Sequence, residues 1–259
     1  MPPEPRTITI DNANRLLTVT ESGLSRDIPL FGKEAFELIS REWVRIGWSL
    51  RYYHTFTWLG LPILQLPEDL VRMQEVVYAV KPDLIIETGV FDGGSLLFYA
   101  GLFETIGNGR IVGIDIEIRP SAREGLGKHH LAHRIELLEG DSTAPEIVSA
   151  VKSRVRPGEK VLVILDSNHT RHHVAAELEA YSGLVTPGSC IVAMDGIMQD
   201  LADVPGGDPR WEFDNPSQAA IAFAAKYPEF SLHPPAWRTN ISDLEKNITY
   251  WPNAWLWRK

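Results

Sequence analysis

Residues 84–95 read LIIETGVFDGGS, an apolar segment of strand length that runs directly into two acids and three glycines. A turn that only reverses the chain needs one glycine or an Asn-Gly pair. Gly89, Gly93 and Gly94 together indicate a backbone that closely approaches something other than protein, because glycine has no Cβ atom to keep a bound molecule away. This stretch therefore predicts a buried strand followed by a ligand-binding turn.

Similar apolar segments recur along the chain, separated by stretches of helical character. Strands that alternate with helices predict a parallel sheet with right-handed crossovers and helices on both faces. The segments are continuously apolar rather than alternating, which is typical of strands buried on both faces. The predicted strands are residues 83–88, 110–115, 134–140, 160–166 and 188–195, and the Trp-rich tail from Asn247 onward is predicted to add edge strands.

The first 80 residues have a different pattern. The stretches EAFELISREWVRIGWSLRYYH and PEDLVRMQEVVYAV are predicted helices, and the second ends where Lys81-Pro82 interrupts it. We therefore divide the chain into residues 1–80 and residues 81–259. The first part is predicted to be a helical cap over the sheet or a subunit contact, which would make the protein a homo-oligomer. The second part carries the sheet.

Composition limits the classes of partner. The chain of 259 residues has 34 acids against 25 bases and no basic block, which disfavours nucleic acid. No apolar run approaches the ~20 residues of a transmembrane helix, and no secretory signal is visible. Cys190 is the only cysteine, so an intrachain disulfide and a cysteine zinc cluster are both excluded. We expect a cytoplasmic protein that acts on a small molecule.

Acids stand at or just after the carboxyl ends of all five predicted strands. In open α/β sheets, ligands bind beyond this edge. A single aspartate there is explained equally well as a helix cap, but five acids at one edge are not. The five acids are Glu87, Asp115, Asp141, Asp166 and Asp195.

The spacing ETGVFDGGS selects among cofactors. A nicotinamide dinucleotide requires G-x-G-x-x-G at this turn, and Glu87 would repel its pyrophosphate. A carboxylate can instead accept hydrogen bonds from S-adenosylmethionine, which carries a sulfonium and an ammonium group and no phosphate. Asp115 would accept from the ribose hydroxyls, and Gly140-Asp141-Ser142 would flank the adenine. S-adenosylmethionine is therefore the predicted cofactor, and an NAD-dependent oxidoreductase is the weaker alternative.

The sequence resembles the class I S-adenosylmethionine-dependent methyltransferases, and among them the family named for cephalosporin hydroxylase. The resemblance covers most of residues 57–230, and its most specific stretch is LDSNHTRHHV. It implies a Rossmann-like α/β fold with a seven-stranded, mostly parallel sheet, and residues 81–259 as the catalytic domain. It also implies methyl transfer to a hydroxyl of a sugar-bearing or natural-product molecule, usually with a divalent metal. The predicted cofactor-binding residues are Glu87, Gly89, Asp92, Gly93, Gly94, Ser95, Asp115, Asp141, Ser142 and Asp166.

The same resemblance implies a metal site near Asp166 and Asp195. The family usually places a Glu-Asp pair after the fifth strand, whereas this chain has Met194-Asp195. Mg²⁺ keeps several waters, so two carboxylates and a substrate oxygen can still suffice to hold it. The alternative is that both acids only cap helices or contact the cofactor.

His169, at the start of a predicted helix, is the candidate general base, with Asp166 as the second catalytic residue. Histidine can take the proton from a hydroxyl as that hydroxyl attacks a methyl group, and the resemblance favours this position. A histidine that only bonds the backbone at the helix start is the alternative. Met194 also leaves open a second function, a non-catalytic or regulatory protein that binds the cofactor without turnover.

Overall fold

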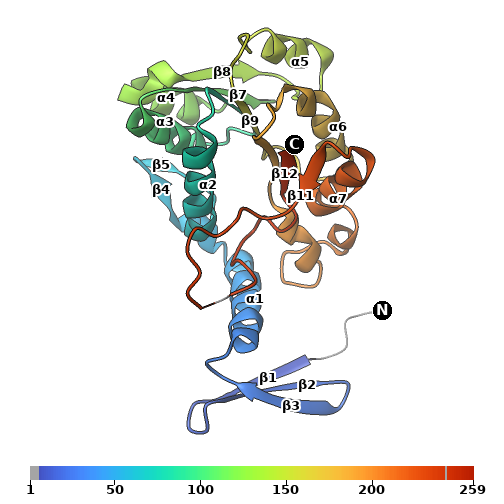
Figure 1. Ribbon diagram of the computed structural model, residues 1–259. Helices are drawn as coiled ribbons and strands as arrows, with labels where there is room; N and C mark the ends of the chain where they lie inside the picture. Colours follow the sequence, from blue (N-terminus) through green and yellow to red (C-terminus); the bar gives the residue numbers. More distant parts are fainter. Residues whose placement is uncertain (1–5, 243) are drawn as a thin grey trace.

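The computed structural model describes residues 6–242 and 244–259 and is built around a seven-stranded sheet (Figure 1). The strand order is β11-β12-β10-β9-β6-β7-β8. Strands β6 to β10 pair in parallel with their neighbours in this order, whereas β12 is antiparallel to both β10 and β11. The predicted seven-stranded, mostly parallel sheet is therefore confirmed. Its strands are β6 (Leu84–Thr88), β7 (Arg110–Asp115), β8 (Ile135–Glu139), β9 (Val161–Leu165), β10 (Cys190–Ala193), β11 (Phe230–Leu232) and β12 (Trp255–Arg258).

The Trp-rich tail departs from the prediction in one respect. Its strand, β12, is not at the edge of the sheet, because it lies between β10 and β11. Trp255 and Leu256 are buried there, and Phe230 of β11 pairs with Arg258 to complete the sheet. The short strand β11 is the edge strand.

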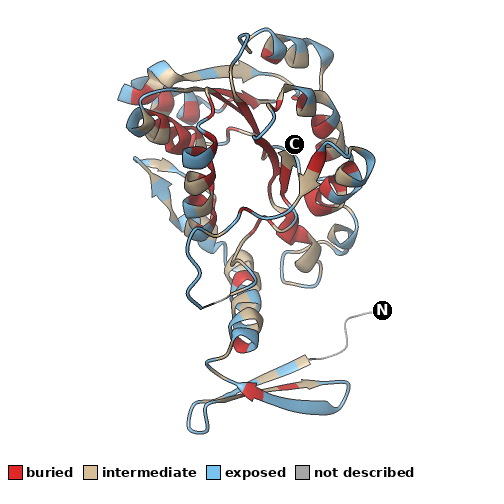
Figure 2. Cartoon of the chain, viewed as in Figure 1, coloured by how far each residue is buried: buried red, intermediate tan, exposed pale blue. Residues whose placement is uncertain are grey.

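Helices cover both faces of the sheet and bury its side chains in two separate clusters (Figure 2). In β6, Ile85 belongs to the cluster beneath α2, α3 and α4, whereas Leu84 and Ile86 belong to the cluster beneath α5, α6 and α7. This alternation follows from the period of two in an extended strand. The helices are α2 (Pro67–Val80), α3 (Gly94–Ile106), α4 (Pro120–Lys128), α5 (Pro145–Lys152), α6 (Arg171–Tyr181) and α7 (Pro216–Lys226).

The N-terminal part is only partly helical. The predicted helices are present as α1 (Lys33–Ser49) and α2, but the helical prediction is wrong for residues 6–29. These residues form an antiparallel sheet of β1 (Arg6–Asp11), β2 (Leu16–Glu21) and β3 (Leu24–Pro29), which α1 joins to the rest of the molecule (Figure 1). Ser22 and Gly23 both have positive φ, the requirement of a tight hairpin turn. Residues 1–5 of the predicted cap lie outside the described residues.

Two further segments bring the N-terminal part to the sheet edge. A short hairpin of β4 (Thr57–Trp58) and β5 (Leu61–Pro62) packs on α3, and the chain then runs through residues 63–66 into α2. No helix in the described part of the chain is long and apolar enough to cross a bilayer.

Candidate active site

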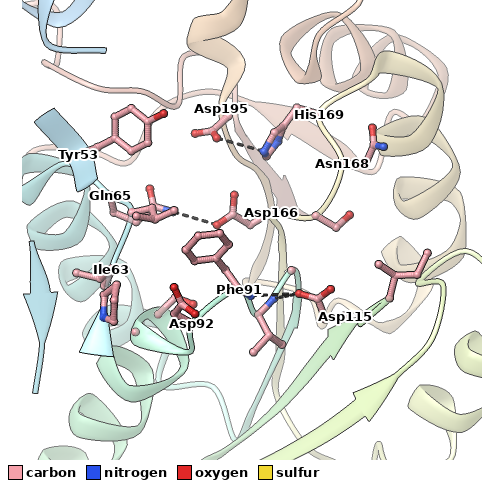
Figure 3. Close-up of a pocket in the computed structure, with 18 of the residues that line it drawn as sticks. Tyr53, Ile63, Gln65, Phe91, Asp92, Asp115, Asp166, Asn168, His169 and Asp195 are labelled. Carbon is pink, nitrogen blue, oxygen red and sulfur yellow. Dashed lines mark hydrogen bonds and ion pairs between the residues drawn. The ribbon is translucent and has the colours of Figure 1, made fainter. Parts of the chain in front are cut away.

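A cavity of about 880 Å³ lies beyond the carboxyl ends of the parallel strands (Figure 3). One wall is the turn after β6, and the opposite wall comes from the N-terminal part of the chain. Of the predicted site residues, all of which are described, Glu87 and Gly93 do not line the cavity. Those that line it are Gly89, Asp92, Gly94, Ser95, Asp115, Asp141, Ser142, Asp166, His169 and Asp195.

The main chain of neighbouring segments lies too close to two of the glycines after β6 for a side chain to fit. A Cβ atom on Gly89 would lie 2.1 Å from the backbone oxygen of Asp166, and one on Gly94 would lie 2.1 Å from that of Pro62. Both distances are far inside van der Waals contact, so any larger residue would push these segments apart. The prediction that the turn approaches a non-protein group omitted this main-chain contact, although Gly89 and Gly94 also line the cavity. The glycines let three segments converge around the cavity.

Glu87 lies beneath the turn rather than in the cavity. It is fully buried, and its Oε2 accepts a hydrogen bond of 2.9 Å from the Ser95 hydroxyl, which does line the cavity. Burial raises the pKa of Glu87 to about 8, and the hydrogen bond from Ser95 only partly opposes this shift. Glu87 can therefore act on a ligand only through Ser95 or through the local field.

Asp115 holds the turn in place. Its Oδ2 accepts hydrogen bonds from the backbone amides of Val90 (2.8 Å) and Phe91 (3.1 Å), and its Oδ1 accepts from the amide of Glu117 (3.2 Å). Phe91 adopts a left-handed backbone conformation, and the Arg119 guanidinium lies 3.7 Å from the centre of its ring. Phe91 and Arg119 both line the cavity, and sequence reasoning missed them. No local pattern indicates this contact.

A buried hydrogen-bond network supports the far end of the cavity. The Ser142 hydroxyl donates to Glu177 Oε1 over 2.6 Å, and the Ser167 hydroxyl donates to the same oxygen over 2.7 Å. His173 Nε2 lies 3.4 Å from this carboxylate, which raises the pKa of His173. Sequence reasoning assigned no role to His173 or Glu177. Their spacing of four residues, with an acid on the buried face of α6, is the signal that could have found them.

Asp166, His169 and Asp195 converge as the sequence predicts. One ligand atom from each lies within 4.8 Å of those of the other two, and His169 Nε2 lies 3.4 Å from Asp195 Oδ2. Burial and the charges of Asp195 and Glu87 hold the pKa of Asp166 well above its usual range. Burial also raises the pKa of Asp195, which the charge of His169 opposes. Two acids forced together in this way favour a cation between them.

The donor set fits a divalent cation. Carboxylates are the preferred ligands of Mg²⁺ and Mn²⁺, and an imidazole is acceptable to Mn²⁺. Gln65, missed in the sequence, adds an amide: its Nε2 donates to Asp166 Oδ2 over 3.0 Å and lies 3.6 Å from Met194 Sδ. Met194 itself is buried and offers no oxygen. Asp166 and Asp195 are the residues that would hold the metal.

Aromatic residues also line the cavity that contains Asp166 and Asp195. Tyr53 lines the cavity, and burial, together with the charge of the nearby Asp195, raises the pKa of Tyr53. Trp48 from α1 and Trp211 also line it, with ring centres 5.4 Å apart and nearly perpendicular planes. This part of the cavity is aromatic, which suits it to the face of a sugar or another ring.

The fold is that of the class I methyltransferases. A structure described as a CmcI-N160 apo-structure superposes with a TM-score of 0.51 at 17% identity, covering 79% of this chain and 76% of that chain. A putative caffeoyl-CoA O-methyltransferase from Staphylococcus aureus gives a TM-score of 0.54 at 13% identity, covering 78% of this chain and 92% of that one.

Residues 50–259 match the family described as Rhamnosyl O-methyltransferase/CmcI, and the chain belongs to this family. A rhamnosyl O-methyltransferase of Mycobacterium leprae (strain TN) is 29% identical over 213 residues, which cover 80% of this chain and 85% of that protein. One from Mycobacterium tuberculosis (strain ATCC 25618 / H37Rv) is 25% identical over 221 residues, or 82% of this chain and 85% of that protein. The predicted family resemblance is confirmed.

Proposed function

We propose that this protein transfers the methyl group of S-adenosylmethionine to a hydroxyl of a sugar-bearing small molecule. The observation that carries this proposal is the placement of a histidine and two acids beside the glycine turn, in one cavity whose remaining wall is aromatic. Its family relatives named as rhamnosyl O-methyltransferases support a sugar as the acceptor. The family and the donor set support a divalent cation as a second cofactor.

The cofactor's adenosyl part is assigned to the end of the cavity formed by the turn after β6 and by the segment after β8. Asp115 and Asp141 would accept from its ribose and adenine, while Ser142 stays fixed by its bond to Glu177. The methionine part would reach Ser95 above Glu87. With the cofactor bound at this end, Asp166 and His169 would be left to act on the acceptor hydroxyl.

His169 is assigned the role of general base, which accepts the proton of the attacking hydroxyl. The acceptor oxygen forms a bond to the methyl carbon as the carbon–sulfur bond breaks, the electron pair stays on sulfur, and S-adenosylhomocysteine leaves. His169 Nε2 takes the hydroxyl proton, and Asp195, 3.4 Å away, stabilises the resulting imidazolium. A divalent cation, when bound, supplies positive charge that orients the hydroxyl and favours its alkoxide form.

Calorimetric titration with S-adenosylhomocysteine tests cofactor binding, and a methylation assay with labelled S-adenosylmethionine tests turnover. The acceptor panel should contain rhamnosides, other deoxysugar glycosides, polyketides and phenols. Saturable cofactor binding with methylation of a glycoside is the expected result. Methylation of phenols alone would contradict the acceptor class, and no cofactor binding up to millimolar concentration would contradict the reaction.

A non-catalytic cofactor-binding protein is the second candidate, because Met194 stands where the family usually has an acid. It predicts tight binding of S-adenosylhomocysteine without methylation of any member of the panel. Homo-oligomerisation through the N-terminal part and a cytoplasmic location stay predictions, and light scattering of the purified chain tests the first of them.

A further inference from the structure

One polar atom in the acidic part of the cavity lacks a partner. Gln65 is only 4% exposed, and its Nε2 is bonded to Asp166. Its Oε1 is buried, and no donor in residues 6–242 or 244–259 reaches it. Figure 3 shows the Gln65 amide at the part of the cavity where Tyr53 and Asp195 lie. A buried carbonyl oxygen without a partner is costly, so a bound group is expected to satisfy it.

We infer that Gln65 Oε1 is an oxygen ligand of the divalent cation held by Asp166 and Asp195, in place of the carboxylate that Met194 cannot supply. This inference rests on the metal-assisted form of the proposed function. Met194 Sδ lies 3.6 Å from Gln65 Nε2, so Gln65 is a direct neighbour of the residue that stands where the family usually has an acid. An amide oxygen is an ordinary ligand of hard divalent cations.

The placement also explains why an amide is suitable here. Two carboxylates balance the charge of a divalent cation, whereas a third would leave a net negative charge at the buried position of Gln65. Gln65 belongs to the segment between β5 and α2, and Asp166 follows β9. The cation would therefore tie the N-terminal part of the chain to the edge of the main sheet.

Mn²⁺ binding measures this role directly, without turnover. Electron paramagnetic resonance can count free Mn²⁺ in the presence of saturating S-adenosylhomocysteine, and the thermal unfolding midpoint can be recorded with and without Mn²⁺. Gln65→Leu removes the oxygen at similar size and should weaken Mn²⁺ affinity by roughly 10- to 100-fold. Its affinity for S-adenosylhomocysteine should stay within about twofold of wild type, because Gln65 lies on the acidic side of the cavity.

Gln65→Glu replaces the amide by a carboxylate and should tighten Mn²⁺ binding. Without the cation it loses the hydrogen bond to Asp166 and adds a like charge, so Mn²⁺ should raise its unfolding midpoint more than that of wild type. Met194→Leu is the matched control: it changes the neighbour of Gln65 but no oxygen, and should keep wild-type Mn²⁺ affinity.

Wild-type Mn²⁺ affinity in Gln65→Leu would overturn the inference. If that variant does not fold, weaker Mn²⁺ binding by Gln65→Glu than by wild type would overturn it as well. A wild-type protein that binds S-adenosylhomocysteine and methylates a glycoside without binding Mn²⁺ would also overturn it and leave the proposed reaction intact. Failure to bind S-adenosylhomocysteine would instead contradict the proposed function.

Discussion

The two ends of the cavity differ in how completely their polar groups are paired. At the adenosyl end, Asp115 accepts three backbone amides, and Ser142 is bonded to Glu177. At the acidic end, the carboxyl groups of Asp166 and Asp195 lie close together, and His169 Nε2 lies 3.4 Å from Asp195 Oδ2. The first end is organised before any ligand binds, whereas the second depends on a ligand to relieve repulsion. Substitutions at the two ends should therefore have different consequences.

The largest effect is expected at Asp195. Asp195→Ala removes a proposed metal ligand and the partner of His169, so kcat should fall by roughly 10³-fold or more, as expected when an electrostatic group of the reaction is lost. The affinity for S-adenosylhomocysteine should hardly change, because the adenosyl end is paired independently. A steady-state assay and a calorimetric titration measure the two quantities.

Asp200→Ala is the control for Asp195→Ala. Asp200 is a nearby carboxylate that pairs with Arg41 rather than with the cavity, so kcat should be unchanged. Chelation of divalent cations should reproduce the loss caused by Asp195→Ala. Full activity in the presence of chelator would mean that the two acids serve only the fold or the cofactor.

His169→Ala should lower kcat by roughly 10²–10⁴-fold, the usual contribution of a general base. Cofactor affinity should again be preserved. His172→Ala is a matched control, because His172 is exposed on α6, which begins two residues after His169, and lies outside the cavity. A His169→Gln variant with kcat near that of wild type would contradict the role of His169 as general base. Asp166 or the cation would then have to activate the hydroxyl.

Asp115→Ala should weaken cofactor binding more than it lowers kcat, the reverse of what is expected for Asp195→Ala. It frees the amides of Val90 and Phe91, loosens the turn and removes an acceptor for the ribose, so S-adenosylhomocysteine should bind roughly 10- to 100-fold more weakly. At saturating cofactor, kcat should fall much less than in Asp195→Ala. Glu139→Gln is the control, since Glu139 ends the neighbouring strand but pairs with Arg123. Equal cofactor affinity in Asp115→Ala and wild type would contradict the division between the two ends.

The smallest expected effect is on the free energy of unfolding, and it comes from Glu87. Its pKa is raised to about 8 in the folded protein from the ordinary 4.5, so between these values the folded state keeps a proton that the unfolded state releases. The unligated protein should therefore lose stability as pH rises from 5 to 8, on the order of 1 kcal/mol per pH unit.

Urea unfolding of wild type and Glu87→Gln at several pH values measures this contribution. The variant carries no proton to lose, so the difference between the two curves cancels the buried Asp69, whose pKa is raised to about 7. Parallel profiles would show that Glu87 is not the titrating group. A steeper fall in the variant would contradict the direction of the shift.

Local pattern was sufficient for the centre of the fold and for many of the residues that line the cavity. Strands such as β6 and β9 were predicted because a strand buried on both faces must be continuously apolar. Asp115, Asp166 and Asp195 were found because parallel strands bring their carboxyl ends to one edge. The same reasoning placed β12 wrongly at the edge, since strand order depends on pairing between segments far apart in the chain.

The sequence by itself thus determined the fold class and the acids that follow the strands, because these follow from hydrophobic period and short-range spacing. Its resemblance to a known family indicated the family and His169. Only the tertiary structure decided which residues face those acids from elsewhere. Tyr53 and Gln65 reach the cavity from before the first strand of the main sheet, and Gln65 meets Asp166 across 101 positions of the chain. The tertiary structure also showed that Gly89 and Gly94 adjoin the main chain of other segments, and that Glu87 lies beneath the cavity. Such contacts arise from packing between distant segments, and no local pattern of residues encodes them.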